Sequence, residues 1–298
     1  MPWRAVTNGN SGKRNKLQRG RDMRNHTITG GGGLPLHASE WGDTTKPALM
    51  FIHGWSQSYL SWVRQFEADL ARTHHVVAID LRGHGMSGKP LDADAYSDSN
   101  LWADDIDAVI NTLGLKQPVL AGWSYGGLVI CDYLRLHGDA AIAGVNFVGA
   151  ATVLNEAAFG TLIGPGFLDH FANASSPDMA TSIEATKQFL HACFEIEPER
   201  SDFETALAYN MLVPPQVRGN LGARELDNTD ILAAMRKPVL VTHGRADRVV
   251  LPAAGEYIGT HCPTATLSWY DGIGHAPFLE DAPRYNRELA AFVEQCRN

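Results

Sequence analysis

Short apolar segments of strand length alternate with longer helical segments from about residue 26 to the end of the chain. The strand-length segments lie at residues 49–52, 76–79, 119–121, 145–148 and 239–241. They are apolar at nearly every position rather than at every second one, which is typical of strands covered on both faces. Their alternation with helices favours a doubly wound α/β sheet in which most strands run parallel.

Two of the helical segments show the expected spacing clearly. Before the third strand-length segment, apolar residues recur three or four positions apart, at Trp102, Ile106, Val109 and Leu113. Ser99 or Asn100 is suited to cap the start of this helix, and Gly114 stands just past its end. A last helix closes the chain, with one apolar face formed by Tyr285, Leu289 and Phe292.

Residues 152–230 interrupt this alternation. They contain no convincing strand, yet they hold six of the eleven phenylalanines of the chain. We expect a helical cap packed over the sheet rather than a second independent domain. Its aromatic side chains either form a small core of their own or roof an apolar pocket. The candidate pocket residues are Trp123, Phe159, Phe167 and Phe171.

The charge of the chain is unevenly distributed. Residues 1–25 hold seven basic side chains and one acidic side chain, whereas the remaining residues hold 18 basic and 32 acidic ones, a net charge of −14. A folded body of that charge repels polyphosphate, so we expect no nucleic-acid partner. Residues 1–25 are predicted to be a basic extension without fixed structure, followed by a core formed by residues 26–151 and 231–298.

The spacing of the cysteines and the length of the apolar runs indicate the cellular compartment in which the protein is expected. The four cysteines lie far apart, with no CxxC and no metal-ligand spacing, at Cys131, Cys193, Cys262 and Cys296. This usage is typical of a reduced, cytoplasmic protein. No apolar run approaches the roughly 18–20 residues that cross a bilayer, and the basic N-terminus lacks the apolar stretch of a secretory signal. We therefore expect a cytoplasmic protein without a membrane partner; a homo-oligomer is compatible with the sequence.

The segment Gly122-Trp123-Ser124-Tyr125-Gly126 is the strongest chemical signal. It directly follows the strand-length segment 119–121 and precedes a helical run. In that context a G-x-S-x-G string predicts a strained strand-to-helix turn that exposes the serine oxygen at the carboxyl edge of the sheet. The helix start also directs its positive end toward this oxygen. The competing interpretation is a serine in an ordinary glycine turn.

A serine hydroxyl needs a base, and the base needs a carboxylate that orients it. Asp247 follows the segment 239–241, and His275 follows a short strand-like run at residues 266–270. Both therefore lie at the edge where Ser124 is expected, in the chain order Ser, Asp, His. Two alternatives stay open: Asp271 serves as the acid, or Asp247 only caps a turn.

Acyl transfer also needs hydrogen-bond donors for the tetrahedral oxyanion. One candidate is the backbone N–H of Tyr125, directly after Ser124. The other is the backbone N–H of Trp55, in the loop after the segment 49–52, where Gly54 permits close approach. His53 in the same loop is interpreted as a support for the loop rather than as the base.

Taken together, these motifs resemble those of the α/β-hydrolase superfamily, in order and over about residues 30–295. The matching segments are His53-Gly54-Trp55, Asp80-Leu81-Arg82-Gly83-His84-Gly85-Met86-Ser87-Gly88, Gly122-Trp123-Ser124-Tyr125-Gly126-Gly127, His243-Gly244-Arg245-Ala246-Asp247 and Gly274-His275-Ala276-Pro277. The resemblance implies a mostly parallel eight-stranded sheet flanked by helices, with a helical cap inserted after the sixth strand. It also implies a triad of Ser124, Asp247 and His275 that works without a cofactor or metal. The segment around Asp80 and Arg82 resembles a structural motif of the family.

Within the superfamily the chain resembles small serine esterases, lactonases and cofactor-free haloperoxidases (perhydrolases). Dehalogenases and epoxide hydrolases carry Asp where this chain has Ser124. Peracid-forming members often carry Pro where this chain has Ser56, which weakens that assignment. The resemblance therefore implies acyl-enzyme hydrolysis of a small to medium apolar ester or lactone. Alternatives are a carbon–carbon bond hydrolase, which needs a cap cation such as Arg200, Arg218 or Arg224, and a non-catalytic ligand receptor.

Overall fold

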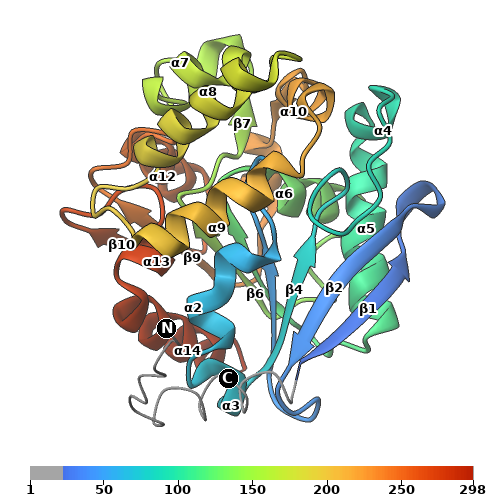
Figure 1. Cartoon of the computed structure of the whole chain (residues 1–298). Helices are drawn as coiled ribbons and strands as arrows, with labels where there is room; N and C mark the ends of the chain where they lie inside the picture. The colour runs from blue at the N-terminus through green and yellow to red at the C-terminus, as the bar shows by residue number, and fades with distance from the viewer. Residues whose placement is uncertain (1–22, 298) are drawn as a thin grey trace, which may run out of the picture.

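The computed structural model describes residues 23–297, and Figure 1 shows its arrangement. The predicted basic extension lies outside the described residues except for residues 23–25. Two of these three, Arg24 and Asn25, already belong to the first strand. The folded core therefore begins slightly earlier than residue 26. All four cysteines are free thiols.

Eight strands form one central sheet in the order β1-β2-β4-β3-β5-β6-β9-β10. Their bounds are β1 Arg24–Thr29, β2 Pro35–Trp41, β3 Ala48–Ile52, β4 His75–Asp80, β5 Val119–Trp123, β6 Gly144–Val148, β9 Val239–Gly244 and β10 Ala265–Tyr270. The strand β2 pairs antiparallel with β1 and β4, and every other pairing in the sheet is parallel. The predicted mostly parallel eight-stranded sheet is confirmed.

Helices cover both faces of this sheet (Figure 1). Their bounds are α2 Val63–Phe66, α3 Leu70–Thr73, α4 Asp94–Ser97, α5 Ser99–Thr112, α6 Tyr125–His137, α7 Pro165–Ala174, α8 Met179–Ala192, α9 Arg200–Met211, α10 Pro215–Gly222, α11 Thr229–Ala234, α12 Pro252–His261, α13 Pro277–Glu280 and α14 Ala282–Cys296, with 3₁₀ turns η1 Gly31–Gly33, η2 Tyr59–Trp62 and η3 Glu156–Ala158. One face packs against α2, α3, α13 and α14, and the other against α5, α6, α11 and α12.

The N-terminal cap of helix α5 is Asp98, whose carboxylate accepts the Asn100 N–H, rather than the predicted Ser99 or Asn100.

Of the helices between β6 and β9 in the chain, α7 to α10 form the cap above the carboxyl edge of the sheet (Figure 1). The expectation that residues 152–230 contain no strand is wrong. Val153–Leu154 (β7) pairs antiparallel with Leu226–Asp227 (β8) and so joins the start of the insertion to its end. Strands of two residues are too short to produce a periodic sequence pattern, which is why the sequence did not reveal them.

A single buried arginine ties the cap helices together. The guanidinium of Arg218 on α10 donates to the carbonyl of Ala174 at 2.7 Å, the hydroxyl of Thr186 at 3.2 Å and the carbonyl of Asn210 at 2.5 Å. These acceptors belong to α7, α8 and α9. Burial lowers the pKa of Arg218 to about 10. The side chain is therefore a structural cation of the cap: its two terminal NH₂ groups donate within the cap, while its Nε is buried without a hydrogen-bond partner in the described part of the chain.

The segment after β4 is held by buried charges, as its resemblance to a structural motif implies. The carboxylate of Asp80 accepts the N–H groups of Tyr59 and Met86, both at 2.9 Å. The guanidinium of Arg82 pairs with Asp105 at 2.7 Å, and both side chains are almost fully buried. These contacts join the segment after β4 to η2, which follows the loop after β3, and to α5.

Candidate active site

Ser124 occupies the turn between β5 and α6 in a conformation that few residues adopt. Its backbone angles are φ 55° and ψ −117°. Such a strained conformation persists only where the surrounding structure imposes it, and it is concentrated at functional sites. Glycine is required two residues later, because a Cβ on Gly126 would lie 2.6 Å from the carbonyl oxygen of Ile52. The geometry is that of the turn expected from the sequence.

Asp247 and His275 meet at the carboxyl ends of β9 and β10. The Nδ1 of His275 lies 2.7 Å from Oδ2 of Asp247, and both side chains are buried. The other carboxylate oxygen accepts the N–H groups of Val249 at 2.8 Å and Val250 at 3.0 Å. Burial alone would raise the pKa of Asp247, but the electrostatic attraction and hydrogen bonds of His275 and His243 hold it at about 2. The carboxylate is therefore charged and fixed at neutral pH.

The alternative acid is placed elsewhere. The side chain of Asp271 is 88% exposed and forms an ion pair with Arg245 at 3.0 Å. A different residue, not anticipated as part of the site, does contact the buried carboxylate: Nε2 of His243 lies 3.3 Å from Oδ2 of Asp247 and 2.9 Å from the carbonyl of Val250. Two signals in the sequence could have indicated it: its position four residues before Asp247, and its place at the start of the family-like segment His243-Gly244-Arg245-Ala246-Asp247.

The structure brings His275 beside the serine turn without joining the two side chains. Within residues 23–297 the Nε2 atom of His275 is buried and has no hydrogen-bond partner, so no hydrogen bond connects it to Ser124. The neighbour of the serine does hold this loop, because the indole of Trp123 donates to the carbonyl of His275 at 2.9 Å. Catalytic hydrogen bonds of this kind are often long in unliganded enzymes and shorten when substrate binds.

The loop after β3 runs close to Ser124. A Cβ on Gly54 would lie 3.0 Å from the Cβ of Ser124. In the described part of the chain, the backbone N–H groups of Trp55 and Tyr125 have no hydrogen-bond partner. Two free donors beside Ser124 are the kind of groups that could bind an oxyanion.

Two buried neutral histidines support this loop. His53 accepts the Leu81 N–H at Nε2, at 3.0 Å, and its Nδ1 lies 2.8 Å from the carbonyl of Gly54. His84 accepts the Ser56 N–H at Nε2, at 3.1 Å. Because Nε2 is the acceptor in both rings, both are neutral with the proton on Nδ1. His53 thus has the supporting role interpreted from the sequence.

This arrangement predicts a loss of stability in mild acid. Burial lowers the pKa of His53 to about 4, below the unfolded value of 6.5. Between these values the unfolded chain binds a proton that the folded protein excludes, so the free energy of unfolding is highest above pH 6.5 and decreases toward pH 4, by about 3 kcal/mol from this residue. Urea unfolding at a series of pH values tests this. His53→Gln should show a shallower decrease over this window, and an unchanged slope would contradict the assignment.

A small apolar cavity of about 30 Å³ adjoins Ser124. Its lining residues are Trp55, Ser124, Tyr125, Leu128, Ala151, Leu154, Ile163, Phe167, Gly222, Val249 and Val250. Of the candidate pocket residues, Phe167 lines this cavity. Phe171 lies behind it, against the rings of Trp55 and Phe167. Trp123 is engaged with His275, and Phe159 is 41% exposed and outside the lining.

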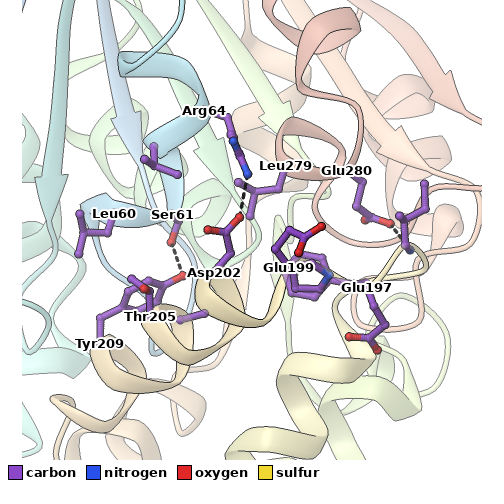
Figure 2. Close-up of a pocket in the computed structure, with 15 residues that line it drawn as sticks. Leu60, Ser61, Arg64, Glu197, Glu199, Asp202, Thr205, Tyr209, Leu279 and Glu280 are labelled. Atoms are coloured by element: carbon purple, nitrogen blue, oxygen red, sulfur yellow. Dashed lines mark hydrogen bonds and ion pairs between the residues drawn. The ribbon is translucent and has the colours of Figure 1, made fainter. Parts of the chain in front are cut away.

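A larger cavity, of about 280 Å³, lies away from Ser124 (Figure 2). It is bounded by α9 of the cap, by η2 and α2, and by α13. Arg64 and Asp202 face each other across it with an ion pair of 2.7 Å, and Tyr209 accepts a hydrogen bond from Ser61 at 3.4 Å (Figure 2). None of its lining residues is Ser124, Asp247 or His275, but one of them, Glu280, contacts the loop that carries His275.

The sheet, the cap and a serine turn beside a buried Asp–His pair define the α/β-hydrolase class. The family with the α/β-hydrolase fold matches residues 47–282, and the chain belongs to this family. It is similar to an esterase of known structure from Rhodococcus sp. ECU1013, at 34% identity and a TM-score of 0.86, over 91% of this chain and 98% of that one.

Two relatives in sequence have names that state an enzymatic activity. The chain is 27% identical over 287 residues to a non-heme haloperoxidase from Rhodococcus erythropolis, a match that covers 90% of this chain and 98% of the relative. It is 26% identical over 280 residues to a bifunctional esterase/perhydrolase from Acinetobacter calcoaceticus, covering 89% and 98%. These likenesses support hydrolase chemistry on small molecules.

No helix among residues 23–297 is long and apolar enough to cross a membrane. In the same part of the chain, no group of three or more His, Cys, Asp or Glu side chains is arranged to hold a metal ion.

Proposed function

We propose that the protein is a serine hydrolase that cleaves small carboxylic esters or lactones through an acyl-enzyme. The observation that carries the proposal is the buried 2.7 Å contact between His275 and Asp247, with Nε2 of the same imidazole left without a partner beside the strained turn of Ser124. An imidazole oriented by a carboxylate on one side and free on the other is a general base.

In the proposed mechanism Ser124 attacks the carbonyl carbon while His275 takes the hydroxyl proton at Nε2. Asp247 keeps the proton of the imidazole on Nδ1 and stabilises the imidazolium that forms. The backbone N–H groups of Trp55 and Tyr125 bind the oxyanion of the tetrahedral intermediate. His275 then protonates the leaving alcohol and, in the second half, activates the water that releases the acid.

The size of the cavity beside Ser124 limits the acyl group. The cavity is small, at about 30 Å³, and its walls are apolar side chains such as Leu128, Ile163 and Val250. Longer chains would require these side chains to move, which costs packing energy. We therefore infer a preference for acetyl and other short acyl groups.

Carbon–carbon bond cleavage is supported less well. That reaction needs a cap cation that faces the substrate carboxylate, and the three candidates are placed otherwise. Arg200 is 91% exposed and pairs with Glu204, Arg218 binds cap backbone, and Arg224 pairs with Asp132 at 2.8 Å. Among the described residues, no arginine or lysine lines the cavity beside Ser124.

Peracid formation is disfavoured by the local backbone at Ser56. Its φ is 62°, and its N–H donates to His84 at 3.1 Å. Proline, which peracid-forming relatives often carry at this place, fixes φ near −65° and has no N–H. The loop after β3 therefore adopts a conformation that the proline-containing loop excludes.

The proposal is tested by measuring kcat/KM for p-nitrophenyl esters from acetate to octanoate, together with a lactone and a vinylogous diketone. We expect acetate to be the best ester. Ile163→Ala removes one wall of the cavity and should raise the octanoate-to-acetate ratio of kcat/KM about tenfold. Ile142→Ala, an equal truncation of a buried residue outside the cavity, should leave this ratio unchanged. Turnover of the diketone alone would overturn the ester assignment.

A further inference from the structure

Glu280, the last residue of α13, contacts the backbone on both sides of His275. Its Oε1 accepts the N–H of Gly274 at 3.1 Å and that of Ala276 at 3.3 Å. The Gly274 N–H also lies 3.2 Å from Oε2. The two peptide groups that flank the candidate base are therefore fixed by one carboxylate, five positions further along the chain.

The same carboxylate also binds the cap. Its Oε2 accepts the N–H groups of Glu195 and Ile196, both at 2.9 Å, in the loop between α8 and α9. Figure 2 shows Glu280 directed at this loop, where a dashed line joins the two. Four backbone N–H groups, from two segments about eighty residues apart, thus share one side chain.

His275 itself completes the connection between the two segments. Its N–H donates to the carbonyl of Cys193, the residue at the start of the same cap loop, at 2.9 Å. The fit is close, because a Cβ on Gly274 would lie 2.8 Å from the backbone nitrogen of Glu195. Since Trp123 binds the carbonyl of His275, the backbone of the base is held from the cap, from α13 and from the serine turn.

A carboxylate suits this position because the four backbone groups that hydrogen-bond to it are all N–H donors. An ionised carboxyl group offers only acceptors, whereas an amide of the same shape replaces one oxygen with an NH₂ group. Glutamine at this position would satisfy one segment and present donors to the N–H groups of the other. An unpaired N–H in such a place costs the bond and its desolvation.

We propose that Glu280 is a positioning residue for His275: it ties the loop of the imidazole to the cap segment 193–196 and thereby holds Nε2 in place for Ser124. This inference rests on the proposed hydrolase function. A displacement of about 1 Å at a reacting group typically costs on the order of 100-fold in rate. We therefore expect loss of the Glu280 contacts to lower kcat rather than to weaken substrate binding.

The test compares Glu280→Gln with the wild type. We expect kcat for p-nitrophenyl acetate to decrease by about 10- to 100-fold while KM changes less than twofold. Hydrogen–deuterium exchange should become faster in peptides that contain residues 193–196 and 274–276. A merely structural role predicts a lower melting temperature with unchanged kcat per folded molecule.

The matched control is Glu197→Gln. Glu197 lines the same cavity and belongs to the same cap loop, but its carboxylate pairs with His191 at 2.9 Å and does not contact the loop of His275. We expect wild-type kcat and wild-type exchange. If Glu280→Gln does not fold, Glu280→Asp is the second variant, because it keeps the charge on a shorter side chain. We expect it to show a smaller decrease in kcat and a smaller increase in hydrogen–deuterium exchange in the same peptides.

The outcomes separate this inference from the proposed function. Faster exchange in both segments with unchanged kcat would show that Glu280 does not position the base. Unchanged exchange would show that the carboxylate does not join the segments. If the wild type hydrolyses no ester, the proposed function fails, while the exchange data still report whether Glu280 holds the two segments together.

Discussion

Ser124→Ala is expected to reduce ester hydrolysis on the order of 10⁶-fold, which in practice means to the rate in buffer. Removing the hydroxyl removes the atom that forms the acyl-enzyme, and no other group in the small cavity is a nucleophile of comparable reactivity. The measurement is the release of p-nitrophenol from the acetate ester by the wild type and the variant at equal concentration.

The fold should be unaffected, because alanine occupies the same strained turn with the loss of one oxygen. The thermal unfolding midpoints of the two proteins should therefore agree. A fluorophosphonate probe should label the wild type once, on the peptide that contains Ser124, and should not label the variant. Retained turnover would identify a different nucleophile. Ester binding without turnover by the wild type would favour the receptor interpretation.

Asp247→Asn should lower kcat about 10⁴-fold with a small change in KM. One oxygen of Asp247 accepts the N–H groups of Val249 and Val250, so the amide oxygen of asparagine should take that place. Its NH₂ group then faces Nδ1 of His275 and donates to it. The imidazole is forced to carry its proton on Nε2, where it cannot accept the proton of Ser124.

The control for this substitution is Asp271→Asn. Asp271 is the other candidate acid from the sequence, and its exposed side chain lies against Arg245. We expect wild-type kcat and KM from this variant under the same assay conditions. Reversed results, with activity lost in Asp271→Asn and kept in Asp247→Asn, would falsify the proposed assignment of the acid.

Local chemical context made much of the candidate site predictable. Ser124 lies between a buried strand and a helix, with Gly122 and Gly126 two positions away on either side, and that pattern in that context favours a strained turn. Asp247 and His275 each follow a strand, and the carboxyl ends of parallel strands meet at one edge. The close approach of the loop after β3 to Ser124 was also predictable, since Gly54 permits an approach that a side chain would block.

The contacts that decide the finer geometry had no such local signal. Glu280 joins Gly274 to Ile196, and Arg218 binds three helices of the cap, so each acts on partners that are distant in the chain. The sequence likewise gave no local signal that Phe159 lies outside the pocket. An aromatic residue in a cap is equally suited to a pocket or to the cap surface.

By itself, the order of apolar, glycine and polar residues determined the class of fold and the edge of the sheet at which Ser124, His275 and the two candidate acids lie, because strand periodicity and tight turns depend on neighbours in the chain. Only the tertiary structure decided which acid meets His275, how small the cavity beside Ser124 is, and that Glu280 joins the cap to the loop that carries His275. Those properties depend on distances between segments far apart in the sequence, which packing sets and residue order does not specify.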